Sequence, residues 1–181
     1  MHTRATAHSG APAGDGILLD ALVRHGLAMP PGHPGLGLNA TVEVRAALDA
    51  LRSQPRARSS SLPSLVREIC IDGTSRALEP ALCLLRHGLI DPNGRDHEGK
   101  TVLHAIAAWL DDGTNYAHGY PTVAQRVAAL VEVGVDVHAT CHLHQLTALD
   151  YAVWREEDVV IEALVSAGAA ALARHRGQDN F

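Results

Sequence analysis

The chain has 181 residues, and 46% of them are hydrophobic, which is enough apolar material for one folded domain with a continuous core. The formal net charge is −5, with fewer basic than acidic residues, so a general affinity for nucleic acid is not expected. No apolar run is long enough to cross a bilayer, and the three cysteines are too few for a disulfide framework. These features favour a cytoplasmic, reducing environment without membrane insertion.

The first third of the chain predicts short helices separated by loops. Residues 1–16, rich in Ala, Gly, His and Ser, are expected to form a flexible N-terminal segment without the apolar stretch of a secretory signal. Apolar residues at helical spacing predict a helix over residues 17–25, and the proline- and glycine-rich residues 30–37 predict a loop after it. The next helix is predicted to open at Thr41 and to run to about Ser53.

Two further helices are predicted before the middle of the chain. The polar, arginine- and serine-rich residues 54–61 precede them and form the best internal linker. Residues 62–72 carry an inward apolar stripe, and Pro63 is tolerated in their first turn. Residues 77–87 carry a second stripe, which Pro80 permits only because it lies near the start of the helix.

One nine-residue stretch occurs twice in the second half of the chain. The sequence GKTVLHAIA at residues 99–107 returns, altered, as QLTALDYAV at residues 145–153. In each copy a threonine, Thr101 or Thr147, stands where a helix N-cap belongs, and apolar residues follow at helical spacing. Each copy is followed by another apolar helix that ends at a glycine. The pattern predicts helices over residues 101–110, 122–133, 147–155 and 158–167.

The connection that leads into each copy also keeps its length. Thr101 follows Gly88 by 13 positions, and Thr147 follows Gly134 by 13 positions. With the two motif copies, this spacing resembles the ankyrin-repeat family and its T-P-L-H-x-A pattern. Val102 and Ala148 stand at the family's proline, Ile106 at its alanine, and Asp150 at its histidine. The resemblance implies an all-α, ankyrin-type helical repeat solenoid of about four helix pairs joined by short turns.

The resemblance also implies a division of the chain. The repeat domain would cover residues 17–168, with its clearest units at residues 94–134 and 140–168 and degenerate units before residue 94. Residues 169–181 would form a C-terminal cap or tail, since a stack of repeats needs atypical ends. His104 is interpreted as a structural histidine whose imidazole bonds back to the turn before it, because a fold by itself carries no chemistry.

One predicted unit is longer than its neighbour. Thr147 and Gly168 are 21 positions apart, whereas Thr101 and Gly134 are 33 positions apart. The excess falls around residues 111–123, between the two helices of one unit, and it contains acidic and aromatic side chains. Loops that carry such groups on a rigid scaffold are common sites of binding, so the insertion is predicted to contribute to partner recognition.

The resemblance implies a non-enzymatic protein–protein interaction module without a cofactor. Ankyrin-type stacks bind with their turn tips and inner helices, and tryptophan and tyrosine are enriched among interface hot spots. The candidate partner-binding residues lie on two turn tips, late in two inner helices and in the insertion: His97, Glu98, Lys100, Trp109, Asp111, Asp112, Tyr116, His118, Tyr120, His142, His144, Gln145 and Trp154. The two tryptophans have an alternative interpretation as residues that fill gaps between helices.

A metal-binding or cysteine-dependent enzyme is the alternative from another functional class. Cys141, His142 and His144 stand close together, with thiolate and imidazole ligands of the kind that bind zinc. No second ligand pair follows at zinc-finger spacing, and no protease signature surrounds the cysteine. Cys70 and Cys83 lie on apolar helix faces, where an inert thiol is expected.

The choice of basic residues bears on the organism and compartment in which the protein works. All but one of the 15 are arginines, with Lys100 as the exception. This composition fits a bacterial genome with GC-rich codons, and it also fits a protein that avoids ubiquitin attachment inside a eukaryotic host. An effector acting on a host protein and an immunity-type or regulatory binder in the bacterial cytoplasm therefore both remain open.

Overall fold

The computed structural model describes residues 22, 36–54, 61–72, 77–109 and 121–169. These residues form seven helices, and no strand lies among them. The helices are α2 (Leu38–Arg52), α3 (Leu62–Asp72), α4 (Leu78–Arg86), α5 (Val102–Trp109), α6 (Val123–Glu132), α7 (Ala148–Trp154) and α8 (Asp158–Ser166). None of the helices described is long and apolar enough to cross a membrane.

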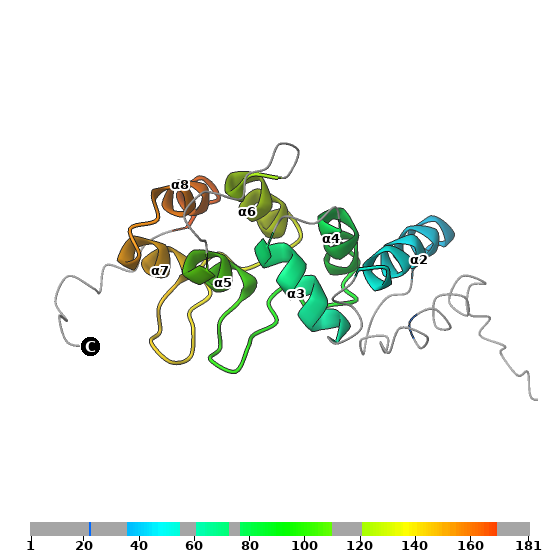
Figure 1. Ribbon diagram of the computed structural model, residues 1–181, viewed down its shortest axis with the longest axis horizontal. Coiled ribbons are helices and arrows are strands. Elements are labelled where there is room, and N and C mark those ends of the chain that lie inside the picture. The colour runs from blue at the N-terminus through cyan, green and yellow to red at the C-terminus, as the bar shows by residue number, and fades with distance from the viewer. Residues whose placement is uncertain (1–21, 23–35, 55–60, 73–76, 110–120, 170–181) are drawn as a thin grey trace, which may run out of the picture.

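The helices lie in two rows (Figure 1). One row contains α3, α5 and α7, in which α5 contacts both of its neighbours. The other row contains α2, α4, α6 and α8, with contacts between α2 and α4 and between α6 and α8. Contacts between α3 and α4 and between α7 and α8 join the rows. The protein is therefore an all-α stack in which each helix of one row is followed along the chain by a helix of the other.

Most predicted helices are confirmed. The helix α3 has the predicted bounds, and α4 to α8 differ from the predictions by no more than one residue at each end. Capping boxes start two of them: the Thr122 hydroxyl accepts from the Gln125 N–H before α6, and the Thr147 hydroxyl accepts from the Asp150 N–H before α7. The local cap and the apolar period were sufficient to locate these elements.

The predicted start of α2 is wrong. The helix begins at Leu38 with Gly37 at its N-cap, three residues before Thr41. The Thr41 hydroxyl instead donates within the helix to the Gly37 carbonyl at 3.1 Å, a bond that threonine makes in a helix interior as readily as it caps one. Of the predicted helix over residues 17–25, only Leu22 lies within the described residues, and it is helical and buried. The linker, the proline-rich loop and the C-terminal tail lie essentially outside them.

Three helices end in the same way. At the ends of α4, α6 and α8, a glycine with positive φ is followed by a residue whose N–H donates to a leucine carbonyl five positions back. These bonds run from Leu89 to Leu84, from Val135 to Leu130 and from Ala169 to Leu164, at 3.0, 3.0 and 2.9 Å. This is the Schellman arrangement, which satisfies carbonyls that a helix leaves without partners.

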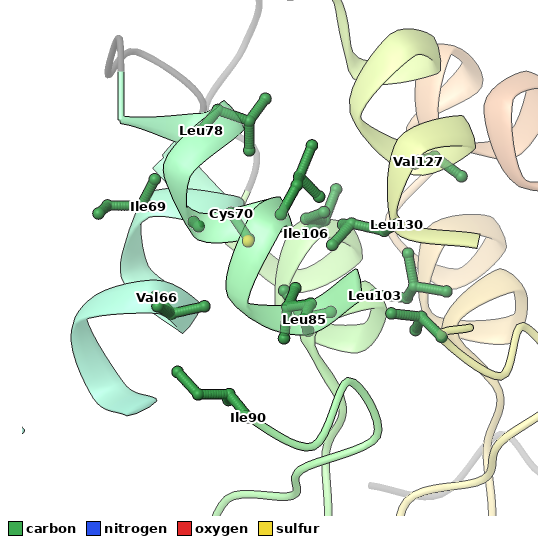
Figure 2. Packing of buried hydrophobic residues seen from close by; sticks show 14 of the residues in the cluster. Val66, Ile69, Cys70, Leu78, Leu85, Ile90, Leu103, Ile106, Val127 and Leu130 are labelled. Atoms are coloured by element: carbon green, nitrogen blue, oxygen red, sulfur yellow. The ribbon is translucent and has the colours of Figure 1, made fainter. Parts of the chain in front are cut away.

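The core is one continuous cluster of small and branched side chains. Figure 2 shows that Val66 and Ile69 of α3, Leu85 of α4 and Ile106 of α5 belong to the same packed layer. Leu103, Ile106, Val127 and Leu130 are each at most 1% exposed, so the apolar positions that the helical spacing of α5 and α6 predicts are buried in this cluster. Aromatic side chains contribute little, and this core positions the two long connections described next.

Candidate functional site

The candidate site is built on the connections after α4 and α6. We call residues 89–101 the first connection and residues 135–147 the second connection. They run side by side and project from the same edge of the stack (Figure 1). The backbone N–H of His142 donates to the Glu98 carbonyl at 3.2 Å. The Asn93 amide also donates to the Gly134 carbonyl at 3.0 Å, and its oxygen accepts from the Asp136 N–H at 2.7 Å. The two connections therefore form one surface.

Asp96 and Arg67 fix the shape of the first connection. One oxygen of the Asp96 carboxylate accepts from the backbone N–H groups of Glu98 and Lys100, each at 2.9 Å. The other oxygen pairs with the Arg67 guanidinium of α3 at 3.0 Å. Burial raises the pKa of the Asp96 carboxyl, but the two N–H donors and Arg67 outweigh burial and hold that pKa below its usual value. Arg67 thus anchors the first connection to α3.

His104 joins α5 to the second connection. Its Nε2 lies 2.9 Å from the Leu146 carbonyl, and because a carbonyl only accepts, Nε2 carries the proton. Its Nδ1 therefore accepts from the Thr101 N–H at 3.2 Å and lies 2.9 Å from the Thr101 hydroxyl. The side chain is fully buried, and burial lowers its pKa, so the neutral imidazole is favoured. The geometry confirms a structural histidine that bonds back to its turn.

Asp150 occupies the position in α7 that His104 occupies in α5. Its carboxylate accepts from the Thr147 N–H at 2.8 Å and from the Thr147 hydroxyl at 2.7 Å. An aspartate can replace the histidine here because both side chains place an acceptor over the threonine three positions earlier. Unlike the imidazole, however, the carboxylate has no proton to donate to a following connection.

Lys100, Cys141 and Tyr151 meet at the base of the two connections. The Lys100 ammonium lies 5.2 Å from the centre of the Tyr151 ring, within the range of a cation–π contact, and pairs with the Glu98 carboxylate. The Tyr151 ring also packs edge-on against the His104 ring, with the two ring centres 5.8 Å apart. The Cys141 sulfur lies 3.7 Å from the Tyr151 hydroxyl. Tyr151 therefore contacts α5 and both connections.

The predicted partner-binding residues are distributed unevenly. The side chains of His97, His142, His144 and Gln145 are exposed on the connections, whereas Glu98 and Lys100 are half-buried and paired with each other. Trp154 is 72% exposed and therefore does not fill a gap between helices. Trp109 is the last residue of α5, but its side chain is not described. The predicted residues of the insertion lie outside the described part: Asp111, Asp112, Tyr116, His118 and Tyr120.

Leu143 belongs to the same surface, although the sequence interpretation missed it. This side chain is 65% exposed between His142 and His144. It could have been recognised as an apolar residue inside a polar turn, since it belongs to no apolar pattern of a helix or a strand. Gln145, two residues later, has a φ of 53°, which places a side chain in the left-handed region that favours glycine. The tip of the second connection thus combines an exposed leucine with a strained backbone.

The cysteine and histidines proposed for a metal or catalytic site do not converge. Cys141 is fully buried against Tyr151, whereas His142 and His144 are exposed. Burial raises the pKa of the Cys141 thiol, but the N–H groups of His144 and Leu146 and the Tyr151 hydroxyl outweigh burial, so the pKa lies below its usual value. Across the described ranges, no three His, Cys, Asp or Glu side chains form a group that can hold a metal ion.

Known proteins add no further assignment to this surface. Comparison of the chain with protein-family models, with curated protein sequences and with solved structures gave no match in any of the three.

Proposed function

We propose that this chain is an ankyrin-type helical repeat protein that binds a protein partner and carries out no catalysis. Three matching helix ends, two related threonine caps and two connections of equal length support the repeat architecture. Stacked repeats of this kind present a continuous surface built from their connections and one row of helices. In this chain, that surface would consist of the two connections together with α5 and α7.

The observation that carries the proposal is the exposure of Leu143 and Trp154. Both are large apolar side chains, at 65% and 72% exposed. Trp154 follows Tyr151 by three positions in α7, so it lies on the flank that Tyr151 turns toward α5. Exposed apolar groups that do not pack in the fold, with polar groups around them, are typical of protein-binding surfaces.

A partner-capture experiment followed by matched variants tests the proposal. The full chain serves as bait, a captured protein is purified, and titration calorimetry measures its affinity for wild type and variants. We expect Trp154→Ala and Leu143→Ala each to weaken binding by about tenfold or more if they are hot spots. Val42→Ala is the matched control, because Val42 is 68% exposed but lies on α2, at the opposite end of the molecule from α7 (Figure 1).

The same experiment tests the insertion, because its sequence contains acidic and aromatic side chains. Replacing residues 111–120 by a short Gly/Ser turn should weaken the same partner while circular dichroism stays unchanged, and Tyr120→Ala should reproduce part of the loss. Equal affinities for wild type, Trp154→Ala and Leu143→Ala would reject the proposed surface. Measurable turnover of a substrate that requires Cys141 would reject the non-enzymatic function.

A further inference from the structure

The helix α7 ends in the same way as α4, α6 and α8, but with a different residue at the turn. The Glu157 N–H donates to the Ala152 carbonyl, five positions back, at 3.0 Å, and the Glu156 N–H donates to the Val153 carbonyl at 3.2 Å. Glu156 therefore stands where the other three helices have a glycine, and its φ of 60° lies in the left-handed region. A side chain in this conformation crowds the following carbonyl, which costs free energy that a glycine avoids.

Contacts within the described residues do not compensate for this cost. The Glu156 side chain is exposed, and its carboxylate forms no hydrogen bond or ion pair with any residue that the structure describes. The neighbouring Arg155 guanidinium pairs instead with Glu157, at 3.9 Å. Strained residues are concentrated at sites where the strained side chain has a function. The role of the Glu156 carboxylate therefore lies in a contact that the described residues do not make.

Trp154 is the last residue of α7, two positions before Glu156, and it is 72% exposed. Two residues span at most about 7 Å of chain, so the indole ring and the carboxylate lie at the same edge of the stack. Tryptophan has the best aromatic face for binding a cation, and a carboxylate forms its strongest hydrogen bonds with cationic donors. The planar guanidinium of arginine can make both contacts at once, because it stacks on aromatic rings and pairs with carboxylates through two N–H groups.

The charges around this edge also favour a basic group. Glu156 is followed by Glu157 and Asp158, so three acidic residues stand beside one basic residue, Arg155. Arg155 pairs with Glu157, whereas Asp158 is exposed in the first turn of α8. An acidic partner would be repelled here, and an apolar partner would bury carboxylates without a counter-charge. The edge therefore fits a basic segment of a partner protein.

We propose that the end of α7 binds an arginine side chain of the partner, with the guanidinium stacked on Trp154 and paired with the Glu156 carboxylate. This inference rests on the proposed protein-binding function and specifies the chemistry of the partner. Leu143 and Gln145 repeat the arrangement on the second connection, since an exposed apolar side chain again lies two positions before a side chain with positive φ. Gln145 has an amide in place of the carboxylate, so the requirement for a basic group is confined to the end of α7.

Selection from a random peptide library on the full chain provides the first test. Bound peptides are sequenced after selection on wild type, on Trp154→Ala, on Glu156→Gln and on Glu132→Gln. The last variant is the matched control, because Glu132 is an exposed carboxylate at the end of α6, in the other row of helices. We expect arginine to be enriched among the peptides that bind wild type and the control, and this enrichment to be lost in the other two variants.

Exchanging arginine for citrulline in the most enriched peptide tests the pairing itself. Citrulline keeps the shape of the side chain but has no charge. Titration calorimetry should show that this exchange weakens binding to wild type by about tenfold or more, as expected for a charge-assisted hydrogen bond, and weakens binding to Glu156→Gln much less. Glu156→Gly should also bind the arginine peptide more weakly while it unfolds at a higher temperature, because glycine relieves the positive φ. Loss of binding is thereby separated from loss of the fold.

The outcomes distinguish the arginine site from the function on which it rests. Equal affinities of the arginine and citrulline peptides for wild type would overturn the site. Selected peptides without enriched arginine, whose binding still depends on Leu143 and Trp154, would also overturn it but would support the binding surface. A library from which no peptide binds would reject the protein-binding function. A concentration-dependent dimer that Glu156→Gln dissociates would assign the arginine to a second copy of the chain and overturn the choice of a different partner.

Discussion

The two connections place a residue with positive φ at the same point, two positions before the cap threonine, but they use different residues there. Gly99 has a φ of 76° and Gln145 a φ of 53°. A Cβ on Gly99 would lie 2.3 Å from the His142 side chain and 2.7 Å from its backbone nitrogen. The Gln145 side chain, by contrast, is exposed. Glycine is required in the first connection because the second packs against it, and in the second connection that reason is absent.

The two cap residues differ for a related reason. His104 has an acceptor on one nitrogen for Thr101 and a proton on the other for the Leu146 carbonyl. Asp150 supplies only the acceptor, for Thr147. The imidazole therefore links α5 to the second connection, whereas the carboxylate caps only its own helix, α7. Gly99 and His104 are thus both adapted to contacts with the second connection.

The largest expected effect on stability comes from truncating a buried leucine in α5 or α7. Leu103→Ala and Leu149→Ala should each lower the free energy of unfolding by about 2–5 kcal/mol, because both leucines are buried and the cavity cannot fully collapse. Chemical denaturation measures the change, and Leu143→Ala is the control at an exposed leucine. Stabilities within error of wild type would mean that the inward face has been assigned incorrectly.

Removing the side chains of His104 and Asp150 in turn separates capping of the helix from the bond to the second connection. His104→Ala should lower the free energy of unfolding by about 2–4 kcal/mol, since it leaves both the Thr101 groups and the buried Leu146 carbonyl without their partner. Asp150→Ala loses only the cap, for which about 0.5–2 kcal/mol is expected. Urea unfolding of both variants gives the ranking, and an equal loss would show that the bond to Leu146 adds no stability.

Gly99→Ala tests the packing requirement of the first connection. We expect a loss of about 2 kcal/mol, because the left-handed conformation costs an alanine about 1–2 kcal/mol and the new Cβ displaces His142. Thermal unfolding measures this change. Gly134→Ala serves as the control, since its φ of 96° is also left-handed but a Cβ there would meet nothing within 4 Å, and a similar loss at both positions would argue against the contact with the second connection.

Gln145→Gly is the converse substitution in the second connection. It should stabilise the fold by up to about 1 kcal/mol, because glycine relieves the positive φ but loses more conformational freedom on folding. If Gln145 also contacts a partner, the same variant should bind that partner more weakly while it unfolds at a higher temperature. A lower unfolding temperature would show that the Gln145 side chain contributes contacts that outweigh its backbone strain.

The smallest expected effect is a loss of stability at mildly acidic pH that comes from protonation of His104. Burial lowers the pKa of His104 from 6.5, against the opposing effect of its bond to Leu146. Above pH 6.5 the neutral imidazole is present in both states, and its stabilising effect is complete. Below that pH the unfolded chain binds the proton more readily, so stability falls until the pH reaches the folded pKa. Wild type should therefore lose more stability than His104→Gln between about pH 7.5 and pH 5, and parallel curves would contradict this assignment.

Local patterns in the sequence were enough to locate most helices, but not every start. The capping boxes at Thr122 and Thr147 and the apolar periods of α3 and α5 operate over a few residues, so they can be recognised in one dimension. Thr41 was misassigned as the start of α2 because a threonine hydroxyl can cap a helix or bond within it. The prediction of an inward Leu103 and a structural His104 succeeded because both depend mainly on position after Thr101.

Caps, glycines and apolar spacing within short stretches are enough to specify the helices, the turns between them and the equal length of the connections. Which neighbouring residues are buried and which are exposed depends instead on tertiary packing. Cys141 is buried beside Tyr151 while Leu143 is exposed, although only two positions separate them in the sequence. His104 finds its second partner 42 positions away. Such contacts depend on the stacking of distant segments, which a short stretch of sequence does not encode.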